Sequence, residues 1–318
     1  MMHDGTCHRD NHNSGSVTAE TERGEEDSLP EGAVLRTVFS ALCNLWRLVY
    51  EARWIYYAVE ESPPVYLRVT LVEYAYRELI AWVETLTPFL LRREQNPHYV
   101  VVFHIWLHTA ILDMWQPFVY GKAAAAQEPP PAQAWTAPRT TQLKTFTAQD
   151  RTPEAAYTAS VSQLKQLVVE YRSRHAASTY SILWHNGLIY LVNAMLRCTD
   201  AEWRLYLLLC VYGYERLSRP YRISEVITRG LLTMTMRDTD MSGSEAERIM
   251  TQIRDRGLDH LRDDLHHDIR ATFMVDLSLA LTDPEAAKAE RMASGFGDMA
   301  AFQDMIDFDV MDAEGPLP

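Results

Sequence analysis

The chain has 318 residues, of which 47% are apolar and 23% are charged, a composition typical of a globular protein with a sizeable core. Its net charge is −13, and nearly all of this excess lies after residue 237. The sequence has no basic cluster of the kind that neutralises phosphates, so we expect no DNA binding by this chain alone.

The cysteines and the apolar segments indicate the environment of the protein. Four cysteines occur at unpaired spacings, which favours free thiols in a reducing compartment over a disulfide framework: Cys7, Cys43, Cys198 and Cys210. The first residues lack the apolar stretch of a secretory signal. The longest apolar segment, residues 179–196, contains a histidine and two asparagines, which favours a buried helix over a membrane span. We therefore expect no membrane association.

The first third of the chain contains three predicted helices. Residues 1–31 are polar and mixed in charge, and we expect them to be disordered. A helix begins near Ala33, because apolar residues follow at helical spacing at Val34, Val38, Leu42, Leu45, Val49 and Ala52. Prolines bound two further helices, at about 65–87 and 97–115.

A linker divides the predicted helical body. Residues 121–150 are rich in alanine, proline, threonine and glutamine and show no apolar period. Beyond the linker we expect five helices, over residues 153–174, 179–197, 201–217, 220–236 and 243–256. Thr152 is placed to cap the first of them and Ser242 to cap the last. The second and third of these are apolar nearly all round, so we expect them to form the central hairpin of the core.

The stretch LLLCVYGYERLSRPYR, residues 207–222, contains a charged elbow that is either a reactive site or a joint. Arg216 falls in the last turn of one helix, where a cation complements the helix dipole, and Pro220 suits the first turn of the next. Glu215 is expected to pair with Arg219 one turn further on. These residue types predict a joint between packed helices.

The remaining residues, 257–318, form an acidic C-terminal region with a last helical segment near 260–280. The sequence shows no convincing strand pair and no internal repeat. It therefore predicts an all-α fold, an irregular multi-helix bundle with a disordered N-terminus and an acidic C-terminal tail. The helical domain is expected over residues 32–256, interrupted by the linker 121–150.

Two groups of residues raise the question of metal binding. His104 and His108 lie four residues apart, as in a metalloprotease helix, but no glutamate lies between them, so we interpret them as core histidines with hydrogen-bond partners. The other group has irregular spacing in a segment expected to be unstructured: His3, Cys7, His8 and His12. Neither group predicts a metal site, and no catalytic or cofactor-binding residue is predicted.

An aspartate cluster supplies the alternative in which the chain is an enzyme. Asp263, Asp264 and Asp268 have a spacing suited to Mg²⁺, and all-α isoprenoid synthases hold Mg²⁺ and a diphosphate with such aspartates. Here the cluster lies near the C-terminus, lacks a second metal motif and is interleaved with Arg262 and Arg270, which favours a solvated helix face. We predict no enzymatic activity and keep a magnesium-dependent isoprenoid synthase-like enzyme as the alternative.

The C-terminal tail, residues 296–318, alternates large apolar side chains with aspartates. Such a composition is typical of acidic activation regions, which dock as short helices in coactivator grooves. An ordinary disordered acidic tail is the other interpretation. The residues expected to contact a partner are Phe296, Phe302, Met305, Ile306, Phe308 and Met311.

Several stretches resemble the regulatory region of fungal zinc binuclear cluster transcription factors of the nitrogen-assimilation and secondary-metabolism type. The stretch NPHYVVVFHIWLHTAILDMWQPF, residues 96–118, is similar to a family segment that ends in Pro-Phe, although Gln116 stands where the family usually has arginine. ASVSQLKQLVVEYR, STYSILWHNGLIYLVNAML and YLLLCVYGYERLSRPYRISEVITRGLLTMTMR are similar to the C-terminal half of that region. The resemblance covers residues 33–118 and 151–256, and YGYERL is its most distinctive part.

This resemblance implies an all-α regulatory domain, a nuclear location and control of transcription, with transcription machinery or coactivators as partners. The six cysteines that hold two zinc ions in the family's DNA-binding module have no counterpart, so no cofactor is expected and no DNA-contact residue is carried over. The chain is then a truncated product, a fragment whose DNA-binding module is encoded elsewhere, or a co-regulator that pairs with a full-length relative. A helical scaffold without a transcriptional role is a further alternative.

Overall fold

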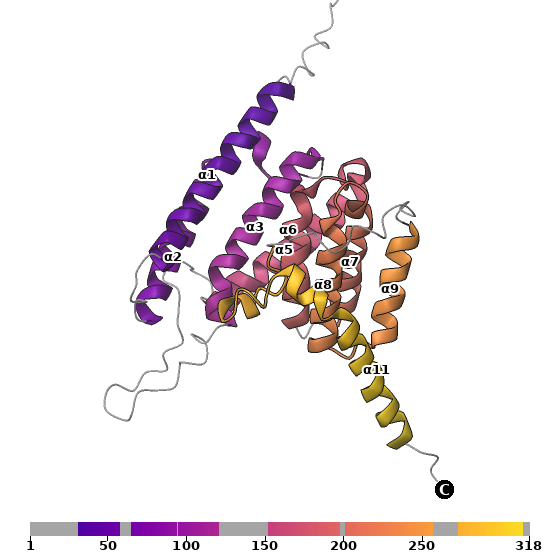
Figure 1. Cartoon of the computed structure of the whole chain (residues 1–318). Helices are drawn as coiled ribbons and strands as arrows, with labels where there is room; N and C mark the ends of the chain where they lie inside the picture. The colour runs from indigo at the N-terminus through magenta and orange to yellow at the C-terminus, as the bar shows by residue number, and fades with distance from the viewer. Residues whose placement is uncertain are drawn as a thin grey trace, which may run out of the picture.

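The computed structural model describes residues 31–57, 65–93, 95–120, 152–197, 201–256 and 273–313, and the regular elements in these ranges are helical (Figure 1). Their only β-type feature is an isolated antiparallel bridge between Met274 and Lys288. The predicted all-α fold is therefore confirmed. Residues 1–30 and the predicted linker 121–150 lie outside the described residues.

Three helices form the first part of the molecule: α1 (Glu31–Tyr57), α2 (Val65–Glu84) and α3 (His98–Val119). α1 and α2 pack against each other, and both contact α3. The apolar stripe predicted on α1 is buried at Val34, Val38, Leu45 and Val49, because one face of this helix covers its two neighbours.

Helices α2 and α3 begin beside Pro64 and Pro97, as the sequence predicted, but their ends differ from the prediction. α2 ends at Glu84, before Pro88, which instead begins the short 3₁₀ helix η1 (Pro88–Leu90). α3 continues through Pro117 to Val119, where the N–H of Tyr120 donates to the carbonyl of Gln116 over 2.9 Å. A proline so close to a helix end removes one backbone hydrogen bond, and the last turn tolerates this loss.

The second part contains α5 (Pro153–Arg174), α6 (His185–Arg197), α7 (Trp203–Ser218), α8 (Ile223–Asp238) and α9 (Gly243–Arg256). Two predicted caps are confirmed, since Thr152 Oγ1 accepts from the N–H of Ala155 over 3.2 Å and Ser242 Oγ accepts from that of Glu245 over 3.2 Å. The predicted helix 179–197 begins later, at His185, because the preceding residues form the 3₁₀ turns η2 (Ala176–Ser178) and η3 (Ile182–Trp184).

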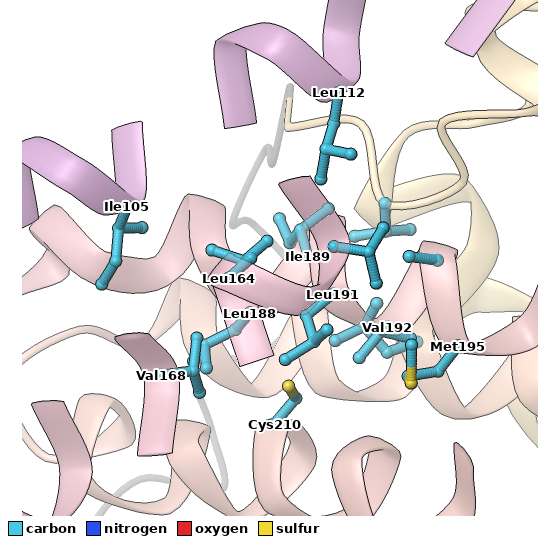
Figure 2. Packing of buried hydrophobic residues seen from close by; sticks show 14 of the residues in the cluster. Ile105, Leu112, Leu164, Val168, Leu188, Ile189, Leu191, Val192, Met195 and Cys210 are labelled. Carbon is cyan, nitrogen blue, oxygen red and sulfur yellow. The ribbon is translucent and has the colours of Figure 1, made fainter. Parts of the chain in front are cut away.

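Helix α6 lies at the centre of the core. Figure 2 shows Leu188, Leu191 and Val192 of α6 beside Cys210 of α7, with Leu112 of α3 approaching from the other side. α6 and α7 pack together as the predicted hairpin. α7 is buried along one side only, since Leu205 is 60% exposed, although its sequence is apolar nearly all round.

The charged elbow joins α7 to α8, as predicted. Arg216 donates to the carbonyl of Ala176 over 3.0 Å, and Arg219 donates to the hydroxyl of Tyr180 over 3.1 Å. The predicted pair between Glu215 and Arg219 is wrong, because Glu215 binds Arg256 of α9 instead, over 3.2 Å. The two arginines therefore tie the joint to the η2 turn and to Tyr180, which follows it.

The described part of the C-terminal region packs against the helical body through α10 (Ala289–Ser294) and α11 (Phe296–Ala313). These two helices follow the turn η5 (Leu279–Leu281). The short helix α10 packs against α8, and α11 packs against α8 and α9. The predicted helix 260–280 is wrong in its described part, where residues 273–278 form a bridge, a bend and a turn. No helix in the described part of the chain is long and apolar enough to cross a membrane.

The close contact between α9 and α11 depends on a glycine. A Cβ atom on Gly243 would overlap the carbonyl of Ala300, whereas one on Gly297, in the same region, would meet no atom within 4 Å. We expect Gly243→Ala to lower the free energy of unfolding by about 1–3 kcal/mol, because the backbone of α11 must move away. Urea denaturation measures this change.

Gly297→Ala is the matched control. It lies inside α11 with free space around it, so the better helix propensity of alanine should raise stability by about 1 kcal/mol or less. Equal stability changes in the two variants would contradict the close packing of α9 and α11.

Candidate interaction surface

The first half of α11 is an exposed apolar surface that is anchored to the helical body. Phe302, Met305 and Ile306 are 57%, 66% and 40% exposed, whereas Phe296 is partly buried against the main core. Phe308 and Met311 belong to the same helix, but their side chains lie outside the described residues. We refer to Phe302, Met305 and Ile306 as the α11 surface.

The acids beside the α11 surface have different roles. Asp298 is exposed in the first turn of α11. Asp304 accepts a hydrogen bond from the N–H of Ser244 over 2.9 Å, at the N-terminal end of α9. A carboxylate at that position satisfies an otherwise unpaired helix N–H and complements the helix dipole. Asp304, one of the aspartates of the predicted acidic tail, therefore attaches α11 to α9.

A buried polar clamp holds the segment that leads to α10 and α11. The amide of Asn193, on α6, donates to the carbonyl of Val275 over 2.7 Å and accepts from the N–H of Leu277 over 2.9 Å. Between them, Asp276 is 1% exposed and binds Arg237 of α8 over 2.6 Å. We call Asn193, Asp276 and Arg237 the Asn–Asp–Arg clamp.

Neighbouring carboxylates keep the Arg237 side chain of the clamp charged. A hydrogen bond to Asp238 and the proximity of Asp276 raise the pKa of the Arg237 guanidinium, which outweighs its partial burial. A buried carboxylate needs such a charged partner, because an unpaired one would lose its hydration without compensation. Sequence reasoning missed this cluster, since Asn193 and Asp276 are separated by more than eighty positions.

Removal of the Asn193 amide tests the clamp. Asn193→Ala leaves the carbonyl of Val275 and the N–H of Leu277 without their partner, and we expect it to destabilise the protein by about 2–4 kcal/mol. Hydrogen exchange should increase most in residues 273–306. Asn44→Ala, at an exposed position of α1, is the control and should change neither quantity. Unchanged exchange in α11 of the Asn193 variant would contradict the clamp.

Of the two histidines of α3, His104 lies in the core, as the sequence predicted, and His108 is partly buried. His104 is buried, and its Nε2 lies 2.8 Å from the carbonyl of Leu90. His108 differs from the prediction, because its Nδ1 is shielded from solvent and has no hydrogen-bond partner in the described part of the chain. Burial and the nearby charges of His104 and Arg92 lower the pKa of His108 to about 3. Burial also lowers the pKa of His185 to about 4.

These histidines make stability depend on pH. Because their pKa values are lower in the folded state than the usual 6.5, the unfolded chain binds more protons between pH 6.5 and about 4. The stability they contribute is complete above pH 6.5 and falls by about 1.4 kcal/mol per pH unit for each group as pH decreases. Urea denaturation of the wild type and of His108→Phe at pH 7 and pH 5 measures this. We expect the free energy of unfolding to decrease less between pH 7 and pH 5 in His108→Phe than in the wild type. Equal decreases in the two proteins would contradict the low pKa of His108.

A hollow of about 430 Å³ lies between α1 and the end of α2. Arg36, Ser40 and Asn44 form one wall and Trp82 and Leu90 belong to the other. The three polar residues are exposed, and no acid, histidine or cysteine occurs among the lining residues. The hollow therefore lacks the paired acid and base groups that catalysis of proton transfer requires.

The other candidate residues of the sequence fall outside the described ranges. This applies to the aspartates Asp263, Asp264 and Asp268 and to the N-terminal group of His3, Cys7, His8 and His12. Within the described ranges, no group of three or more histidine, cysteine, aspartate or glutamate side chains is placed to hold a metal ion.

Comparison with protein-family models, with curated proteins and with solved structures finds no match for this chain. The resemblance to the regulatory region of zinc binuclear cluster factors therefore stays a prediction that rests on the stretches quoted above. The α11 surface is the feature of the described chain that corresponds to a predicted set of site residues.

Proposed function

We propose that this protein regulates transcription and that α11 recruits transcription machinery or coactivators. The observation that carries the proposal is the exposure of Phe302, Met305 and Ile306 on an acidic helix whose first turns are anchored. The resemblance of the helical body to the regulatory region of fungal zinc binuclear cluster factors supports the same role. It suggests a nuclear protein that acts on nitrogen assimilation or a secondary-metabolite gene cluster.

The chemistry of α11 suits recognition by a groove. An amphipathic helix binds such a groove through apolar side chains spaced three or four residues apart, a spacing that Phe302, Met305 and Ile306 follow. The surrounding aspartates favour a partner with a basic rim, which accelerates encounter through long-range attraction. Because α11 is already helical, part of the ordering cost of binding is avoided.

The proposed role is non-catalytic and requires a second protein to reach DNA. The chain has a net charge of −13 and no basic cluster, so phosphate contacts would have to come from a partner. A full-length relative with its own zinc module is the partner that the resemblance suggests.

A tethering assay tests the proposal on the full chain. We fuse residues 1–318 to an unrelated DNA-binding domain and measure a reporter gene in a fungal host. We expect activation, and we expect Phe302→Ala plus Met305→Ala to reduce it about tenfold, because these two side chains are more than half exposed and carry most of the α11 surface.

The control is Leu205→Ala, which removes an apolar side chain that is 60% exposed on α7. This variant should activate as the wild type does, since α7 lies outside the proposed contact. No activation by the wild-type fusion, or equal activation by all three proteins at matched expression, would refute the role of α11.

A further inference from the structure

Helix α1 carries two apolar stripes, although one is sufficient for its packing. The first consists of Val34, Val38, Ala41, Leu45 and Val49, which are buried against the body. In each case the next residue is also apolar, which gives a second stripe with the same spacing on the adjoining face: Leu35, Phe39, Leu42, Trp46 and Tyr50. We call this second set the outer stripe.

The outer stripe is open to solvent over most of its length. Leu35, Phe39, Trp46 and Tyr50 are 47%, 69%, 45% and 63% exposed, and Leu42 is partly buried. α1 runs along one edge of the molecule in Figure 1, in indigo. A helix that is apolar on two adjoining faces is typically covered on both, because a contiguous exposed apolar face marks an interaction site.

The spacing of the outer stripe is symmetric about its own midpoint. Leu35 and Tyr50 lie equally far from the point between residues 42 and 43, as do Phe39 and Trp46. In a two-fold symmetric contact, if residue i meets residue j of the other copy, then j also meets i. Two antiparallel copies of α1 would therefore bring Leu35 against Tyr50 and Phe39 against Trp46, twice each.

We infer that the outer stripe is a homodimer interface in which two copies of α1 pack antiparallel. The stripe extends about 22 Å along the helix, which suits a contact near the lower size limit of specific interfaces. We therefore expect a dimer of moderate affinity, with a dissociation constant of about 1–10 µM.

The charges on α1 favour the antiparallel arrangement. Between Leu35 and Tyr50 the only charged residues are Arg36 and Arg47, and Glu51 follows directly. The antiparallel register places Arg36 of one copy opposite Val49 of the other, two positions from Glu51, which also pairs with Arg47 of its own helix over 2.7 Å. Parallel packing would instead align each arginine with its own counterpart, which costs energy through like-charge repulsion.

Contacts within one copy already orient the centre of the stripe. Trp46 meets Trp106 of α3 edge to face, with ring centroids 5.1 Å apart. The indole N–H of Trp106 donates to the carbonyl of Leu183 over 2.5 Å, and the Leu183 side chain is 50% exposed next to it. A side chain that is held in place before binding loses less conformational freedom on association.

Sedimentation velocity of the full chain tests this inference. The wild type should sediment as a dimer of 36.5 kDa chains at about 100 µM and dissociate at lower concentration. Phe39→Glu should raise the dissociation constant at least about tenfold, because it buries an unpaired charge. Leu205→Glu, at a site of α7 that is also more than half exposed, should leave the dimer intact. A wild type that stays monomeric at about 100 µM would overturn the inference.

The double variant Phe39→Glu plus Trp46→Arg tests the antiparallel register. It sets an acid opposite a base at both symmetric contacts, so we expect it to recover at least about half of the affinity lost in Phe39→Glu. A parallel dimer would align like charges and would not recover. Absence of recovery, with an unchanged circular dichroism spectrum, would overturn the antiparallel arrangement.

Cys43 supplies a second measurement that needs no disruptive substitution. This exposed cysteine lies next to the symmetry point, so the Cys43 side chains of two copies should be close in the dimer. A short bismaleimide should cross-link the wild type at concentrations where it sediments as a dimer, and Cys43→Ser should abolish the product. A product that persists in Cys43→Ser would contradict the arrangement. Because no reporter is involved, these results are independent of the proposed role of α11.

Discussion

The position of the C-terminal helices depends on the Asn–Asp–Arg clamp. Asn193 projects from α6, at the centre of the core, and holds the backbone on both sides of Asp276, which pairs with Arg237 of α8. These bonds join parts of the chain that lie far apart in sequence, and the Asn193 amide and the Asp276 carboxylate are buried, so the loss of a partner leaves buried polar groups unsatisfied. From this fixed point the chain enters α10 and α11, and the α11 surface acquires a defined location on the body.

Two apolar surfaces follow from this architecture, and they lie at different edges of the molecule (Figure 1). The outer stripe belongs to a helix, α1, that packs through its adjoining face against α2 and α3. The α11 surface is anchored by Asp304 and by the close contact at Gly243, while its large side chains stay in solvent. A dimer through α1 would leave α11 of both copies accessible, so one assembly could offer two recruitment helices.

Much of the fold could be read from periodicity and capping residues. Thr152 and Ser242 began helices where predicted, because a side-chain oxygen at that position satisfies an N–H that the helix itself leaves unpaired. Proline was a weaker guide, since Pro117 lies inside α3. The pairing of Glu215 was also wrong, because a neighbouring helix offered Arg256, which local spacing cannot reveal. Of the predicted contact residues, Phe296 is partly buried while Phe302 is exposed.

The sequence by itself determined the all-α class, the buried stripe of α1 and the joint between α7 and α8, because these depend on residues within a few turns of one another. It also determined the acidic, apolar composition of the tail. Only the tertiary structure decided which apolar face of α1 stays exposed, where α11 is anchored and which carboxylate is buried. Those outcomes depend on packing and hydrogen bonds between residues distant in sequence, and no local pattern encodes such pairings.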